Sequence, residues 1–122
     1  MRAIGKYEVR VTGIGEAAFE LLENCNCLII FDDCAPAELG EISILHSSGK
    51  IEGEIKIGDA VGFGENEYII TAIGDEAIKT LEEMGHCTFK FTGNPTSELP
   101  GQIELQGVKR PQIMVGDLIR FI

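Results

Sequence analysis

The segment at residues 42–49 combines a histidine with residue types that handle phosphoryl groups. Within it an apolar stretch is followed by His46, Ser47, Ser48 and Gly49, and the chain contains only two histidines. A neutral imidazole nitrogen can attack phosphorus, while hydroxyl groups and flexible backbone amides can hold the phosphoryl oxygens. His46 is therefore a candidate phosphoryl acceptor, and the three residues after it are candidate contacts to the phosphoryl group.

Strand parity gives a prediction for the position of His46. If residues 42–46 form a regular strand, Ile42 and Ile44 point inward and His46 shares their face. The imidazole would then lie at the rim of the core, partly buried. The same parity also fits a histidine with a purely structural role.

The second histidine, His86, follows Gly85 where a predicted helix ends and a strand begins. One interpretation is a histidine favoured by the helix macrodipole at a C-terminus. The other is a supporting imidazole that orients His46 or bonds a phosphoryl oxygen. The sequence leaves both open.

The cysteines raise the question of a metal site. Cys25, Cys27, Cys34 and Cys87 could supply soft ligands, but Cys-x-Cys is shorter than the usual spacing in structural zinc sites. Cys27 and Cys87 also border apolar strands, where cysteine packs as a small hydrophobic residue. We expect neither a metal nor another cofactor, and a thiol-based metal or redox sensor is the weakest of the alternatives.

Size and charge narrow the class of protein. The chain has 122 residues, of which 44% are hydrophobic, so we expect one domain spanning residues 1–122. It contains no apolar run long enough to cross a bilayer, and we expect a cytoplasmic protein without direct membrane insertion. The net charge of −10 argues against a nucleic-acid partner, because phosphate contacts need a basic face.

The elements that must position these residues are mostly strands. Alternation of apolar and polar residues predicts half-buried strands near residues 7–12, 51–57, 88–91 and 102–106. A continuous apolar run at 27–31 predicts a central strand, and 68–73 and 118–122 complete the set.

Two helices and several tight turns connect these strands. Residues 16–23 and 75–84 have apolar residues at helical spacing, with Asp75 as the expected cap of the second helix and Gly85 as its stop. Residues 57–63 and 115–121 share a pattern of Gly-Asp turn, strand and final Phe. The predicted fold is mainly β: a compact, mostly antiparallel β-barrel-like domain with one or two short helices.

Several short motifs occur in an order that is specific when taken together. They are Phe31, Ala35-Pro36-Ala37, Ile44-Leu45-His46, Gly49, Gly53, Gly58, Tyr68, Thr71-Ala72-Ile73-Gly74, Leu81, Met84-Gly85-His86-Cys87-Thr88-Phe89-Lys90-Phe91, Gly93, Leu99-Pro100-Gly101 and Val115-Gly116-Asp117-Leu118-Ile119-Arg120-Phe121. Together they cover most of the chain. The chain resembles the glucitol/sorbitol-specific enzyme IIA component of the bacterial phosphoenolpyruvate-dependent sugar phosphotransferase system.

The resemblance implies a phosphotransferase component and places the phosphorylated histidine at His46. The donor would be the histidine-containing phosphocarrier protein, and the acceptor would be the IIB component of the glucitol/sorbitol permease. The step would require no metal or nucleotide. The resemblance does not assign a comparable role to His86.

A second hypothesis belongs to a different functional class. The chain could be a non-catalytic β-barrel module for interaction or regulation in which His46 is only structural, because function does not follow from fold. Phosphoryl acceptance distinguishes the two hypotheses.

Overall fold

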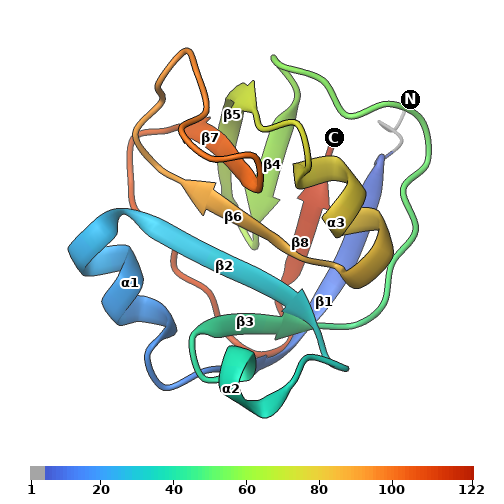
Figure 1. Ribbon diagram of the computed structural model, residues 1–122, viewed down its shortest axis with the longest axis vertical. Coiled ribbons are helices and arrows are strands. Elements are labelled where there is room, and N and C mark those ends of the chain that lie inside the picture. Colours follow the sequence, from blue (N-terminus) through green and yellow to red (C-terminus); the bar gives the residue numbers. More distant parts are fainter. Residues whose placement is uncertain (1–4) are drawn as a thin grey trace.

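The computed structural model describes residues 5–122, whose eight strands close into a barrel with three short helices outside it (Figure 1). The strands are β1 (Tyr7–Ile14), β2 (Cys27–Asp32), β3 (Ser43–His46), β4 (Ala60–Phe63), β5 (Asn66–Ile73), β6 (Cys87–Lys90), β7 (Gln102–Gln106) and β8 (Leu118–Phe121). Around the barrel they follow the order β1-β3-β2-β6-β7-β5-β4-β8. The predicted mainly-β, barrel-like fold is confirmed.

Most neighbouring strands run antiparallel, as predicted. Six of the pairings are antiparallel, and two are parallel, β2 with β3 and β6 with β7. The apolar strand β2 lies between β3 and β6, which confirms its prediction as a central strand. Because β2 and β3 are parallel, their C-terminal ends lie side by side (Figure 1). This end of the barrel carries the site described below.

The barrel interior is filled by alternate side chains of the strands. On β1, Tyr7, Val9 and Val11 are buried while Glu8 and Arg10 are exposed. Aromatic rings pack edge to face inside, as in the contact between Phe63 and Phe89 at 5.2 Å between centroids. A close-packed interior of this kind fixes the inward side chains of β3.

Three helices connect the strands: α1 (Ala18–Cys25), α2 (Ala37–Gly40) and α3 (Ala77–Met84). The two predicted helices correspond to α1 and α3, while the single-turn α2 was not predicted. The predicted cap is wrong, because the N-cap of α3 is Glu76 and no side chain caps it. The predicted stop is confirmed, because Gly85 takes the left-handed conformation at φ 62°. Among residues 5–122, no helix is both long and apolar enough to cross a membrane.

The predicted strand at residues 51–57 is wrong. This segment forms no ladder, and its glycine Gly53 turns the backbone at φ 82°. Ile55 is buried, but Ile57 is 64% exposed, so the alternation does not place all its apolar residues in the core. Alternation describes one strand only, and a strand needs a partner with free hydrogen-bonding groups.

Strand β7 was expected to have one face in water, and this is also wrong. Ile103 and Leu105 point into the core, yet Gln102 and Glu104 on the other face are buried as well. The connection after β6 covers them: the Thr92 hydroxyl donates to Glu104 Oε1 at 2.5 Å, and the Asn94 N–H donates at 3.3 Å.

The shared pattern at 57–63 and 115–121 corresponds to a turn-and-strand unit that occurs twice in the barrel, as expected. Gly58 and Gly116 both have φ 98°, and the resulting strands β4 and β8 pair with each other. In each turn the aspartate Oδ2 accepts the N–H three residues earlier, Lys56 to Asp59 at 2.8 Å and Met114 to Asp117 at 2.9 Å.

Candidate functional site

His46 is the last residue of β3 and points into the end of the barrel. Its neighbours across the ladders are Val11 on β1 and Asp32 on β2. The prediction that it faces inward with Ile44 is confirmed, since both residues are 0% exposed. The expectation of a partly buried position at the rim is wrong, because the end of the barrel is covered over the imidazole.

Both nitrogens of the His46 ring contact backbone carbonyl oxygens. Nδ1 lies 2.7 Å from the Ser47 oxygen, and Nε2 lies 2.7 Å from the Gly85 oxygen. A carbonyl oxygen only accepts hydrogen bonds, and a neutral imidazole carries one N–H. Both hydrogen bonds can therefore form together only when the ring is an imidazolium. A phosphoryl acceptor needs a free lone pair, so one of these contacts must open before the ring can react.

The cover over His46 is the corner between α3 and β6. A Cβ atom on Gly85 would stand 2.5 Å from His46 Cε1 and 2.9 Å from Nε2. Together with its left-handed backbone, this close approach makes glycine necessary here. The corner is anchored by the Gly85 N–H to Leu81 O at 2.9 Å and by the Thr80 hydroxyl to His86 O at 2.7 Å.

Two further side chains lie beside the imidazole, and neither was singled out from the sequence. Asp32 is opposite His46 in the parallel ladder, and its Oδ1 accepts the Cys34 N–H at 3.0 Å. Tyr7 places its ring nearly perpendicular to the imidazole, with 6.4 Å between centroids. The sequence did hold a signal for both, since β2 ends in a polar residue at the position matching His46, and Tyr7 shares the inward parity of β1. Recognising it required the strand order, which the sequence does not give.

The ring of His86 lies against β2. Its Nδ1 is 3.2 Å from the Ile30 carbonyl oxygen, and its ring packs against Phe31 with centroids 4.6 Å apart. His86 is linked to His46 through its neighbour Gly85, whose carbonyl contacts Nε2. In this conformation the interactions of His86 hold the corner beside the imidazole.

The three residues after His46 leave the barrel end along β1. The Ser47 N–H donates to Arg10 O at 2.8 Å, and its hydroxyl accepts the Arg10 N–H at 3.0 Å. That hydroxyl keeps its own proton for donation. Ser48 and Gly49 are exposed, and Gly49 passes close to Tyr7, where an added Cβ would stand 3.1 Å from the ring.

The cysteines are spread over the fold. Cys25 and Cys34 are exposed near opposite ends of β2, Cys27 is half-buried, and Cys87 is inside the barrel. Burial raises the pKa of the Cys87 thiol and so disfavours its thiolate. Within residues 5–122, no three side chains of His, Cys, Asp or Glu are grouped so that they could hold a metal ion.

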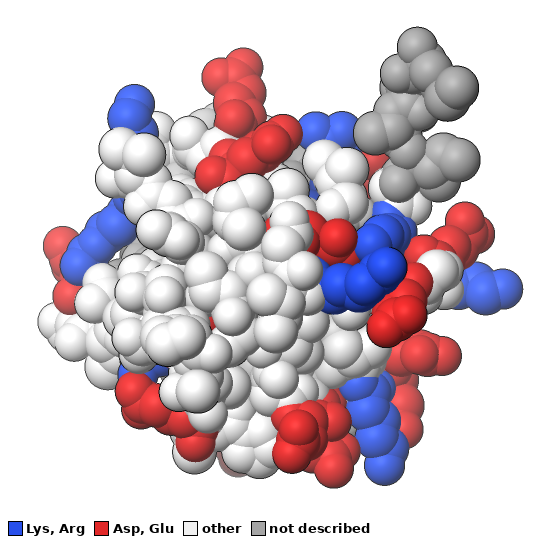
Figure 2. All heavy atoms as spheres, turned by 90° about the horizontal axis from the view of Figure 1, so that it is seen from above, with Lys and Arg blue, Asp and Glu red and all other residues white. Residues whose placement is uncertain are grey.

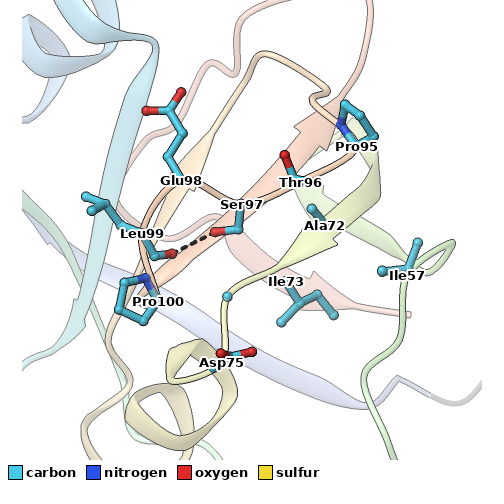
Figure 3. Close-up of a pocket in the computed structure, with 11 residues that line it drawn as sticks. Ile57, Ala72, Ile73, Asp75, Pro95, Thr96, Ser97, Glu98, Leu99 and Pro100 are labelled. Carbon is cyan, nitrogen blue, oxygen red and sulfur yellow. Dashed lines mark hydrogen bonds between the residues drawn. The ribbon is translucent and has the colours of Figure 1, made fainter.

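The surface offers two other features. Figure 2 shows one face whose charged side chains, acidic and basic, lie mainly around its rim. A hollow of about 530 Å³ opens between β5 and the connection that precedes β7 (Figure 3). It is lined by Ile57, Ala72, Ile73, Gly74, Asp75, Pro95, Thr96, Ser97, Glu98, Leu99 and Pro100. Neither histidine lines this hollow.

The chain matches known proteins over nearly its whole length. The sequence model of the PTS system glucitol/sorbitol-specific IIA component matches residues 6–120. The components of that name from Escherichia coli K12 and Shigella flexneri are each 33% identical over 115 residues, covering 94% of this chain and 93% of theirs. The crystal structure of a PTS system IIA component from Enterococcus faecalis V583 superposes with a TM-score of 0.83 and 25% identity, covering 94% of this chain and 98% of that one. The chain belongs to the family of glucitol/sorbitol-specific IIA components of the phosphotransferase system.

Proposed function

We propose that His46 accepts a phosphoryl group from the histidine-containing phosphocarrier protein and passes it to the IIB component of a glucitol/sorbitol permease. Family membership supports the role of phosphoryl carrier. The observation that carries the assignment to His46 is the hydrogen bonding of its enclosed ring: the Ser47 carbonyl can hold Nδ1–H, which leaves the lone pair of a neutral ring on Nε2. His86 has the supporting role, through the corner that covers Nε2.

The geometry favours Nε2 as the attacking nitrogen. Ser47 is fixed to β1 by two hydrogen bonds with Arg10, so its carbonyl stays in place to accept from Nδ1–H. A hydrogen bond from Nδ1–H to a carbonyl sets the tautomer of a neutral imidazole and leaves the lone pair on Nε2. The P–N bond to the carrier's histidine then breaks as a P–N bond to Nε2 forms.

Access to Nε2 follows from the same hydrogen bonds. An imidazolium donates to the Gly85 oxygen and holds the corner closed. In the neutral ring the Nε2 lone pair faces that oxygen, and two acceptors at 2.7 Å repel each other. The nucleophilic form of His46 thus favours opening of the corner that covers it, and alignment with the carrier supplies most of the remaining catalysis.

The competing hypothesis is a structural His46 in a non-catalytic module. The specific observation in its favour is the same enclosure, because a histidine that is 0% exposed and bonded at both nitrogens also fits a core position. The two hypotheses differ in whether the ring ever receives a phosphoryl group.

The experiment uses phosphoenolpyruvate, enzyme I and the phosphocarrier with wild type, His46→Gln and His86→Gln. Glutamine keeps an amide donor near the Gly85 carbonyl but has no nucleophilic nitrogen, which limits damage to the buried site. We expect His46→Gln to fold, by circular dichroism and thermal unfolding, and to take up no acid-labile phosphate. His86→Gln should be labelled more slowly than wild type. Wild-type labelling of folded His46→Gln, or no labelling of the wild type, would support the structural hypothesis.

A further inference from the structure

Tyr7 packs tightly against His46, the proposed phosphoryl acceptor. Its ring meets the His46 imidazole at 87°, and the Phe121 ring contacts it with centroids 5.7 Å apart. Gly49 passes so close that an added Cβ would be 3.1 Å from Cε1 and 3.2 Å from Cζ of Tyr7. The residue is 2% exposed. The phenol therefore has a fixed position at the covered end of the barrel.

The Tyr7 hydroxyl is buried and has no hydrogen-bond partner among residues 5–122. Buried hydroxyl groups in proteins are nearly always paired, and an unpaired one destabilises the fold. The other tyrosine, Tyr68, shows the usual arrangement, with its hydroxyl donating to the Lys109 oxygen at 2.6 Å. The contrast indicates that the Tyr7 hydroxyl is positioned for a group that arrives during function.

The charge state of Tyr7 suits it as a donor. Burial raises the pKa of the phenol, and repulsion from negative charge on Cys87 and Asp32 acts in the same direction. The hydroxyl thus keeps its proton throughout the physiological range. It can donate a hydrogen bond to an anion without giving the proton away.

The polar groups closest to the His46 imidazole are hydrogen-bond acceptors, whereas a phosphoryl group needs hydrogen-bond donors. The groups closest to the ring are the carbonyls of Ser47 and Gly85, and Asp32 stands opposite on the ladder. All of them accept hydrogen bonds or carry negative charge, so a phosphoryl group here depends on donors outside this set, which are the Ser47 hydroxyl, whose proton is free for donation, and the Tyr7 hydroxyl. Phosphoryl transfer depends on donors that neutralise the charge on the phosphoryl oxygens.

We propose that the Tyr7 hydroxyl donates a hydrogen bond to an oxygen of the phosphoryl group carried on His46. This rests on the proposed function. The hydrogen bond pairs the orphaned hydroxyl only in the phosphorylated state, so it favours the transfer step and the product over the resting protein. The P–N bond to the carrier's histidine breaks as a P–N bond to His46 forms, and the phenolic proton stays on Tyr7.

The test compares Tyr7→Phe with Tyr68→Phe in the reconstituted relay. For Tyr7→Phe we expect a melting temperature equal to or above wild type, because the variant removes an unpaired polar group. We expect its phosphorylation rate, and its equilibrium with the phosphocarrier, to fall by about tenfold to a hundredfold. Tyr68→Phe should show the opposite pattern, with a lower melting temperature and wild-type transfer.

The possible outcomes distinguish a failure of the proposal for Tyr7 from a failure of the proposal that His46 is the acceptor. Wild-type rate and equilibrium in Tyr7→Phe overturn the role of Tyr7. So does a loss of transfer accompanied by a fall in melting temperature, because that is the result of a structural role. If His46→Gln is labelled like wild type, the assignment of the acceptor fails. If His46→Gln is silent and Tyr7→Phe is unchanged, only the proposal for Tyr7 fails.

Discussion

At the scale of single residues, the site depends on a glycine as much as on a histidine. In the proposed mechanism His46 supplies the reacting nitrogen, while Gly85 allows a backbone carbonyl to approach that nitrogen to 2.7 Å. Any other residue at position 85 would place a Cβ against the imidazole and strain the left-handed backbone. The chemistry of the ring and the conformation of the corner are therefore coupled through one contact.

Substitution of Gly85 tests this coupling, and Gly53 offers a matched control. Both have positive φ, 62° and 82°, but nothing lies within 4 Å of a Cβ placed on Gly53. Each alanine variant should lose about 1–2 kcal/mol of folding stability, because a residue with a Cβ is disfavoured in the left-handed conformation. Gly85→Ala should lose further stability through the contact with His46, and its phosphoryl acceptance should fall well below that of Gly53→Ala. Thermal unfolding and phosphate labelling measure both effects, and equal results for the two variants would contradict the argument.

At the scale of elements, the repeated Gly-Asp turns close the barrel by starting β4 and β8. Asp59 accepts the Lys56 N–H and also the Lys6 ammonium at 2.7 Å. Desolvation acts to raise the pKa of Asp59, but the hydrogen bonds and charges of Lys6 and Lys56 outweigh it and lower the pKa below 3.8. Asp117 makes the equivalent turn contact to the Met114 N–H.

The lowered pKa gives a pH-dependent prediction for Asp59→Asn. A carboxylate whose pKa is lowered by folding stabilises the native state above its ordinary value of 3.8, and this contribution disappears as pH falls through the lowered value. The variant should therefore be less stable than wild type at neutral pH, by about 1 kcal/mol or less for a partly exposed ion pair. Urea unfolding at several pH values should show the difference shrinking below pH about 4. A difference that persists or grows in acid would contradict the lowered pKa.

Also at this scale, local sequence patterns predicted which elements form more reliably than they predicted what packs against those elements. The apolar run of β2 and the turns before β4 and β8 were identified because their signals lie within a few residues. The burial of Glu104 was not, because it depends on the distant Thr92 and Asn94 folding over β7. The segment 51–57 was mistaken for a strand because alternation says nothing about a partner.

At the scale of the whole molecule, the sequence predicted a mainly-β barrel but not its strand order. The parallel pairing of β2 with β3 brings Asp32 beside His46, and β1 adds Tyr7 from far along the chain. His46 could be proposed from its own neighbours and from the family resemblance. Its complete burial could not, because the covering residue is Gly85, which is adjacent only in three dimensions.

The net charge of −10 leads to a prediction about docking. We expect a basic face of the phosphocarrier to be steered toward this acidic protein, with complementary charge acting mainly on the association rate. Raising salt from low to physiological strength, where the screening length is roughly 8 Å, should slow phosphorylation at limiting carrier. The rate at saturating carrier should change little and serves as the control. A rate indifferent to salt would mean that the acidity serves solubility alone.

The most direct test of the central claim is to locate the phosphoryl group on wild-type protein. Trypsin cleavage after Arg10, Lys50, Lys79 and Lys90 places the two histidines on separate peptides, residues 11–50 and 80–90. Digestion of the phosphorylated protein at alkaline pH, which preserves phosphohistidine, followed by tandem mass spectrometry assigns the group. We predict one phosphoryl group on the peptide 11–50, at His46. A phosphoryl group on the peptide 80–90, at His86, would contradict the account.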